Sequence, residues 1–134
     1  VCPDESPLLG FVTLVSMALA MGNTVIAIPS EHYPLSATDF YQVLETSDVP
    51  PGVLNIVTGA RETLARVLAD HDDVDAIWYA GAPKSDGAKT IEAASVGNMK
   101  RTWIADWPTI AGVPDGEILR AATQVKNIWT PYGE

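Results

Sequence analysis

The sequence has very little cysteine: Cys2 is the single one among 134 residues, so no internal disulfide bond can form. Cysteine usage therefore gives no sign of an oxidising compartment, and we expect a cytoplasmic protein. Basic residues are also few, with 8 Lys and Arg against 17 Asp and Glu and a net charge of -9. Because nucleic acids and anionic membranes would repel such a chain, we expect neither as a partner.

A long uninterrupted apolar run is also lacking. The longest, residues 8–21, contains Gly10, Thr13 and Ser16 and is shorter than the roughly 20 residues that span a bilayer. The sequence opens at Val1 without a charged leader, so we expect no signal peptide and interpret the chain as a piece of a longer protein.

Metal ligands are scarce as well. His32 and His71 are far apart in sequence and lack the neighbouring ligands that zinc requires, so we predict no metal site. The acidic run at residues 70–75 is typical of a solvated helix end.

The remaining sequence alternates between helical periodicity and short β-branched runs. Predicted helices cover residues 7–21, a segment from the possible capping box Ser36 and Asp39 to Ser47, a segment around Leu64, Val67 and Leu68, and about 87–96. Predicted strands cover residues 24–28, 53–57, 76–79 and 99–104. This alternation predicts an α/β fold, a three-layer Rossmann-like parallel sheet with helices on both faces.

The pattern changes after residue 104. Residues 105–116 are rich in Pro and Gly and are predicted to be a connector, a short helix is predicted from Glu117, and residues 123–130 are predicted to be a strand. A length of 134 residues suits a single globular domain.

Several motifs occur in an order that resembles the cofactor domain of aldehyde dehydrogenases. They are residues 2–9, 18–25, 28–31, 50–59, 71–75 and Lys100–Arg101. Residues 124–129 resemble the final strand of that family, which belongs to its oligomerisation element. The resemblance implies an NAD-binding-type domain over 1–104, a connector over 105–116 in place of the catalytic domain, and an oligomerisation-type strand within 117–134. The layout is most similar to the C-terminal, non-catalytic half of family 16 aldehyde dehydrogenases.

Departures from the family pattern remove the chemistry. Glu5 stands where the resemblance implies the Asn that stabilises the oxyanion, and a carboxylate would repel that charge. Ala105 stands at the position of the general base. Cys2 lies in the entrance motif, not at the nucleophile position, so we predict no catalytic residue and no activity for this chain alone.

The cofactor positions are only partly retained. Ile28 replaces the Lys that would reach the ribose, and Pro83 removes one N–H from the phosphate turn. We therefore expect no cofactor in this chain, with NAD in the parent protein by resemblance. The vestigial cofactor-binding candidates are Pro29, Ser30, Glu31, Gly59 and Gly81. The same residues also suit plain turns at strand ends.

Two functions remain open. In the first, the module pairs its final strand with a catalytic aldehyde dehydrogenase half of the same or a partner chain and helps to form a homo-oligomer, with Val125, Ile128 and Trp129 at the interface. Trp107 is a further surface candidate, whereas Trp78 and Trp103 are expected in the core. In the second, the sheet still binds NAD(P) or another nucleotide as a regulatory signal.

Overall fold

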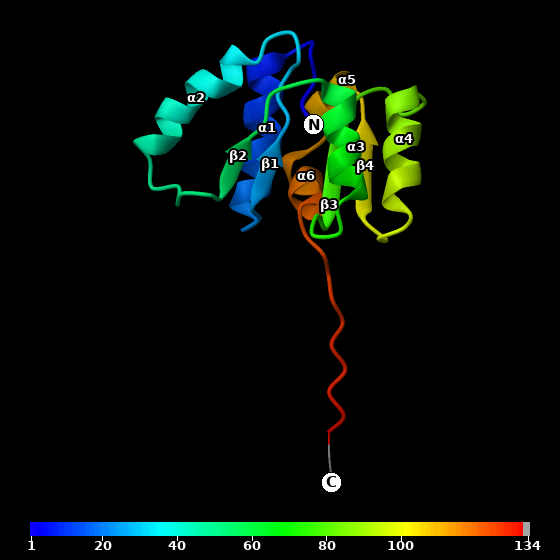
Figure 1. Ribbon diagram of the computed structural model, residues 1–134. Coiled ribbons are helices and arrows are strands. Elements are labelled where there is room, and N and C mark those ends of the chain that lie inside the picture. The colour runs from blue at the N-terminus through cyan, green and yellow to red at the C-terminus, as the bar shows by residue number, and fades with distance from the viewer. Residues whose placement is uncertain (133–134) are drawn as a thin grey trace.

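A computed structural model describes residues 1–132 and shows alternating helices and strands (Figure 1). The strands are β1 (Val25–Ala27), β2 (Leu54–Ile56), β3 (Ala76–Ala80) and β4 (Arg101–Ala105). The helices are α1 (Pro7–Ala20), α2 (Leu35–Glu45), α3 (Arg61–Asp70), α4 (Asp86–Ser95), α5 (Trp107–Gly112) and α6 (Asp115–Ala121). The mixed α/β class is confirmed, and each of the four predicted strand segments overlaps a strand.

The strands form two parallel pairs, β1 with β2 and β3 with β4. The continuous sheet expected from the sequence is not found among residues 1–132. Val1 and Cys2 supply the backbone bonds between the pairs: the amino group of Val1 donates to the Trp78 carbonyl (2.7 Å), and the Cys2 N–H donates to the Ile28 carbonyl (2.8 Å). Two residues are too short to pair along the whole edge, so these backbone bonds join the pairs only near their carboxyl ends.

Two hydrophobic clusters divide the core. The first cluster joins α1, α2 and α5 and includes Phe11, Leu14, Val15, Ala27, Leu54, Ala80, Ala105 and Ile110. The second cluster joins α3 and α4 and includes Ile28, Ala65, Ala69, Ile77, Tyr79, Ala88 and Ile91. Neighbouring residues in one strand belong to different clusters, as Tyr79 and Ala80 do, because successive side chains of a strand point to opposite faces.

Trp78 and Trp103 pack edge to face with ring centroids 5.1 Å apart and lie against the first cluster, as the sequence predicted. Trp107 is partly buried against the same cluster. Part of the Trp107 side chain is therefore used in packing within the chain.

The predicted connector at 105–116 was wrong in its local structure, since it contains α5 and the start of α6, which begins at Asp115 and not at Glu117. The Asp106 side chain accepts a bond from the Thr109 N–H (3.1 Å) and so caps α5, while Pro108 occupies the first turn. Pro is well tolerated there because the first N–H groups of a helix have no partner within the helix. The capping box at Ser36 was wrong too: Pro34 precedes α2 and no side chain caps it.

Residues 123–132, here called the C-terminal tail, are extended and lead away from the folded body (Figure 1). The prediction of a strand at residues 123–130 was wrong, because the tail makes no strand pairing within residues 1–132. A strand requires a partner edge for its backbone groups. No helix of the described chain is both long and apolar enough to cross a membrane.

Candidate functional site

The five cofactor-binding candidates lie in turns at the carboxyl ends of three strands. Pro29, Ser30 and Glu31 follow β1, Gly59 follows β2, and Gly81 follows β3. The turns after β1 and β3 meet around Arg61, the first residue of α3. We call this group the Arg61 cluster; its members are Asp4, Ser30, Glu31, Arg61, Glu62 and Tyr79.

Asp4 organises the turn after β1. Its carboxylate accepts bonds from the Ser30 hydroxyl (2.5 Å) and the Glu31 N–H (3.0 Å), and His32 Nδ1 lies 3.4 Å away. Burial alone would raise the pKa of Asp4, but the hydrogen bonds from Ser30 and His32 outweigh it and hold that pKa below its usual value. Ser30 is buried and its hydroxyl also accepts from the Tyr33 N–H (3.1 Å). The donor and one acceptor position of this hydroxyl are therefore used within the protein.

The Glu31 carboxylate binds a backbone group of the protein itself. Its Oε2 accepts a bond from the Arg61 N–H at 2.8 Å. That N–H is one of the unpaired donors at the start of α3, where a negative charge is favourable. Glu31 thus caps α3 from a distant turn, a role that Ala60 at the N-cap position cannot fill.

The Arg61 side chain links Cys2 to the end of β3. Its guanidinium donates to the Ala80 carbonyl (2.5 Å), the Cys2 carbonyl (3.2 Å) and the Tyr79 hydroxyl (3.0 Å). It also stacks on the Tyr79 ring, 4.4 Å from the centroid, and its side chain is only 12 % exposed. The sequence analysis did not single out Arg61 as a site residue. The available signal was an Arg at the first position of a helix, where the dipole disfavours a cation unless tertiary contacts hold it.

The turn before α4 is poorly suited to a phosphate. The Ser85 hydroxyl already accepts from the Ala88 N–H (3.2 Å), so one of the free donors of the helix start is used. The Tyr79 hydroxyl donates to the Glu62 carboxylate (2.6 Å), and a Cβ on Gly87 would lie only 2.2 Å from that carboxylate. Burial, followed by the hydrogen bond to Glu62, raises the pKa of Tyr79 above its usual value. The space next to Gly87 is thus occupied by an acidic group that would repel a phosphate.

The positions expected to carry acyl chemistry are equally unsuited. Glu5 is exposed and Ala105 is buried at the end of β4, where a methyl group cannot accept a proton. Cys2 is buried, and burial raises the pKa of its thiol, which disfavours the nucleophilic thiolate. Within residues 1–132, no group of three or more His, Cys, Asp or Glu side chains is placed to hold a metal ion.

The sequence pattern of the aldehyde dehydrogenase family matches residues 1–105, most of the chain. This chain belongs to the aldehyde dehydrogenase family. Members of this family are oxidoreductases that generally use NAD(P). The match covers α1 through β4 and ends where α5 begins.

Individual relatives agree with this assignment. The chain is 38 % identical over 104 residues to the NADP/NAD-dependent aldehyde dehydrogenase PuuC of Escherichia coli K12, which covers 78 % of this chain and 21 % of that protein. It is 37 % identical over 101 residues to aldehyde dehydrogenase 1A1 of Rattus norvegicus and to that of Equus caballus, covering 75 % of this chain and 20 % of each relative. The chain therefore spans about a fifth of the length of the curated relatives it matches.

Proposed function

We propose that this chain is a non-catalytic domain of an NAD-dependent aldehyde dehydrogenase family protein, resembling the C-terminal half of family 16 members, and that it acts in structure and oligomer assembly. Residues 1–104 would be the NAD-binding-type domain, 105–116 the connector and 117–134 the assembly element. The two strand pairs would belong to one Rossmann-like sheet with helices on both faces, and the protein would work in the cytoplasm.

The observation that carries the proposal is the exposure of the C-terminal tail. Val125, Ile128 and Trp129 are 85 %, 83 % and 93 % exposed. The tail starts at a fixed point, because Arg101 donates a hydrogen bond to the Thr123 carbonyl (2.5 Å). Three large apolar side chains on an extended, anchored backbone are suited to join the sheet edge of a catalytic half or of a second copy.

Sedimentation velocity of the full chain tests the assembly role. One series varies the concentration of the chain alone, and a second adds the catalytic aldehyde dehydrogenase from the same organism, co-expressed with the chain. Changing Val125, Ile128 and Trp129 together to Ser should weaken association at least about tenfold, since burying each such side chain contributes about 1.5–3 kcal/mol. The matched control changes Gln124 and Asn127 to Ser in the same tail and should leave association unchanged. If the unaltered chain stays monomeric and binds no catalytic partner, the assembly role is wrong.

Loss of catalysis is tested separately, by NADH absorbance with the purified chain, NAD⁺ and simple aldehydes. We expect no turnover, because neither a reactive thiolate nor a general base lies at the expected positions. Measurable NAD⁺ reduction would overturn the non-catalytic assignment while leaving the assembly test intact.

A second candidate function is a regulatory NAD(P) or nucleotide site, favoured by the meeting of the turns after β1 and β3. The residues present do not fit a dinucleotide well, because Ser30 and Glu31 are used by Asp4 and Arg61, and Glu62 lies beside the turn before α4. Titration calorimetry with NAD⁺ and NADP⁺ decides between the two functions. Heat of binding at millimolar ligand or below would favour this second function.

A further inference from the structure

The outer edge of β2 is open. Among residues 1–132, β2 pairs with β1 alone and is the outermost strand on the side of α2 (Figure 1). The Val53 carbonyl accepts a hydrogen bond from β1 (2.8 Å), and the Val57 N–H donates one to β1 (2.9 Å). Because alternate residues of a parallel strand bond to the same neighbour, Leu54 and Ile56 direct their N–H and C=O groups away from β1. These groups have the spacing that an added strand needs.

A groove of about 510 Å³ lies beside this edge. Its lining combines Thr38 and Tyr41 of α2 with Asn55, Ile56 and Val57 of the β2 segment. Tyr41 is 44 % exposed and Val57 is 39 % exposed. The groove thus places open ladder positions between two exposed apolar side chains.

The β2 edge lacks most of the features that keep an open strand from pairing. Such edges are commonly very short or carry Lys, Pro or a bulge. β2 is short, but residues 53–57 contain no charged residue and no Pro, and the register with β1 is continuous. An edge of this composition is suited to accept a further strand.

The surface around the groove is acidic. Between residues 33 and 60 the charged residues are Asp39, Glu45 and Asp48, all exposed, and there is no Lys or Arg. Pairing of the β2 edges of two copies would bring these like charges together, which is unfavourable. A basic segment without acidic residues is favoured as the occupant.

The C-terminal tail has these properties. Residues 124–130 contain Lys126 as their one charged residue and no Pro or Gly, so every N–H of the segment can join a ladder. In an extended backbone, Val125 and Trp129 point to one face and Ile128 points to the other. The tail therefore carries apolar side chains on both faces.

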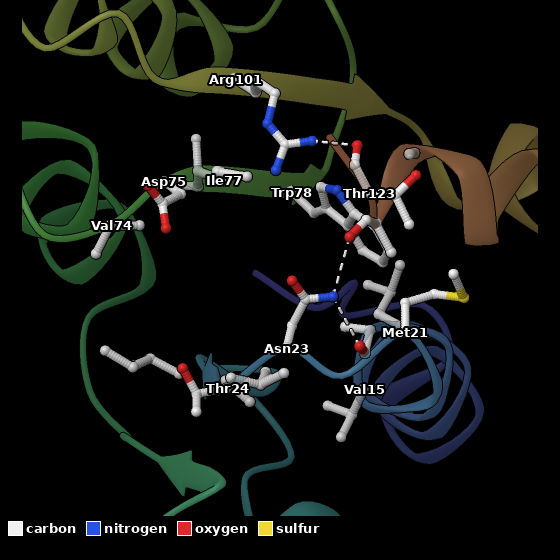
Figure 2. Close-up of a pocket in the computed structure, with 18 of the residues that line it drawn as sticks. Val15, Met21, Asn23, Thr24, Val74, Asp75, Ile77, Trp78, Arg101 and Thr123 are labelled. Atoms are coloured by element: carbon white, nitrogen blue, oxygen red, sulfur yellow. Dashed lines mark hydrogen bonds between the residues drawn. The ribbon is translucent and has the colours of Figure 1, made fainter. Parts of the chain in front are cut away.

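The tail is presented away from the body of its own copy. Figure 2 shows how its start is held: the Asn23 amide donates to the Ala122 carbonyl (3.0 Å), and Arg101 donates to the Thr123 carbonyl. From there the backbone runs away from the folded body and not along β2 (Figure 1). The available partner for the tail is thus another molecule.

We infer that the open edge of β2 and the groove beside it are the acceptor site for the C-terminal tail of a second copy of this chain, which adds residues 124–130 as one more strand. Leu54 and Ile56 supply the backbone groups of the new ladder. The inference rests on the assembly role proposed above and names the surface that receives the tail.

The exposed side chains of the tail match the two sides of the groove. Val125 and Trp129 pack on Tyr41 from one face of the added strand. Ile128, on the opposite face, packs on Val57. The apolar side chains that are exposed on the tail and on the groove are then covered together.

The outer edge of β4 is a poorer acceptor. β4 starts at Arg101, directly after Lys100, so its amino end has the same charge as Lys126 of the tail. Repulsion between like charges therefore favours β2 over β4.

The first test measures self-association of the full chain by sedimentation velocity over a concentration series. Tyr41→Lys places a positive charge in the groove that receives Lys126 and should weaken association at least about tenfold, because like charges across an interface repel. Val43→Lys is the matched control. Val43 lies on the same helix and is 54 % exposed, but it lies outside the groove lining, so association should stay unchanged.

A second pair of variants tests the backbone of β2. Ile56→Pro removes an N–H that faces the open edge and takes no part in the ladder with β1. Ile56→Ala keeps that N–H and loses the same packing against the first hydrophobic cluster. Association should be at least about fivefold weaker in Ile56→Pro than in Ile56→Ala, because the added strand loses a hydrogen bond. Circular dichroism checks that both variants fold.

Amide hydrogen exchange of the unaltered chain locates the added strand. The N–H groups of Leu54 and Ile56 should exchange at least about tenfold more slowly at concentrations where the chain associates, because they gain ladder partners. Residues 125–130 should become protected over the same range of concentration.

Association that Tyr41→Lys leaves unchanged, or exchange at Leu54 and Ile56 that does not depend on concentration, would overturn the acceptor site. A chain that stays monomeric would also overturn it, and protection of these groups in the monomer would assign the groove to the tail of the same copy. The assembly role is judged separately. It stands without this acceptor if the Ser substitutions in the tail weaken association and Tyr41→Lys does not, or if a chain that is monomeric alone binds the catalytic partner.

Discussion

Gly81 shows that a residue expected to approach a cofactor instead approaches a side chain of the protein. A Cβ at this position would lie 2.3 Å from Cε1 of Tyr79 and 3.1 Å from its Cδ1. The Tyr79 ring is 3 % exposed and its hydroxyl is bound by Arg61 and Glu62, so it has little freedom to move. Packing against Tyr79 is therefore a sufficient reason for glycine at this position.

We expect Gly81→Ala to lower the free energy of unfolding by about 1–3 kcal/mol, the usual cost of overpacking. Chemical denaturation of the two proteins measures it. Gly97→Ala is the matched control, since no atom lies within 4 Å of the Cβ position there. A loss of stability in the control equal to that of Gly81→Ala would argue against the contact with Tyr79.

Asp4 gives the turn after β1 a dependence on pH. Because the folded-state pKa of Asp4 is depressed, its ionised form stabilises the fold above the pKa of the unfolded chain, about 3.9, and this contribution is lost as the pH falls through the folded-state value. We expect Asp4→Asn to flatten the fall of unfolding free energy as the pH drops below about 5. Urea unfolding at a series of pH values measures it, with the exposed residue Asp39, changed to Asn, as the control.

At the scale of elements, helix starts are where the sequence was least informative. Ser36 and Asp39 have the spacing of a capping box, but Pro34 fixes the backbone earlier and α2 begins at Leu35. Ser85, which was not singled out, caps α4 through its hydroxyl. Local spacing alone could not rank these two serines.

Ser85 and Ser36 should therefore differ in their contribution to the free energy of unfolding. Ser85→Ala should lower the free energy of unfolding by about 1 kcal/mol, the usual value of an N-cap hydrogen bond. Ser36→Ala should change it by less than about 0.5 kcal/mol, because its side chain caps nothing. Thermal unfolding of both variants decides, and a larger effect at Ser36 would contradict the assignment of the caps.

Strands were predicted more accurately because β-branched runs mark buried strands directly. The run at 53–57 contains β2, and the run at 76–79 lies within β3. Helix α5 was missed and the start of α6 was predicted two residues late, because Pro108 and Pro114 suggested a break, whereas both lie where helices begin. The tail was predicted as a strand from its composition, which cannot show whether a partner edge is present.

For the whole molecule, the location of the candidate site could be predicted and its internal contacts could not. The turn residues Pro29, Ser30 and Gly81 follow from where strands end, because parallel strands share one carboxyl edge. Arg61 joins Cys2 and Ala80, which lie 59 and 19 residues away in sequence. Such contacts follow from the folded arrangement and have no local pattern.

The bonds that tie the two strand pairs have a consequence for which substitutions the protein can tolerate. Besides the amino group of Val1 and the N–H of Cys2, the donors are the side chains of Arg61, Asn23 and Arg101, and their acceptors include the backbone carbonyls of Cys2, Ala122 and Thr123. Every residue type supplies a carbonyl, so substitutions at the acceptor positions preserve these bonds, and among the side chains the constraint on sequence falls on Arg61, Asn23 and Arg101.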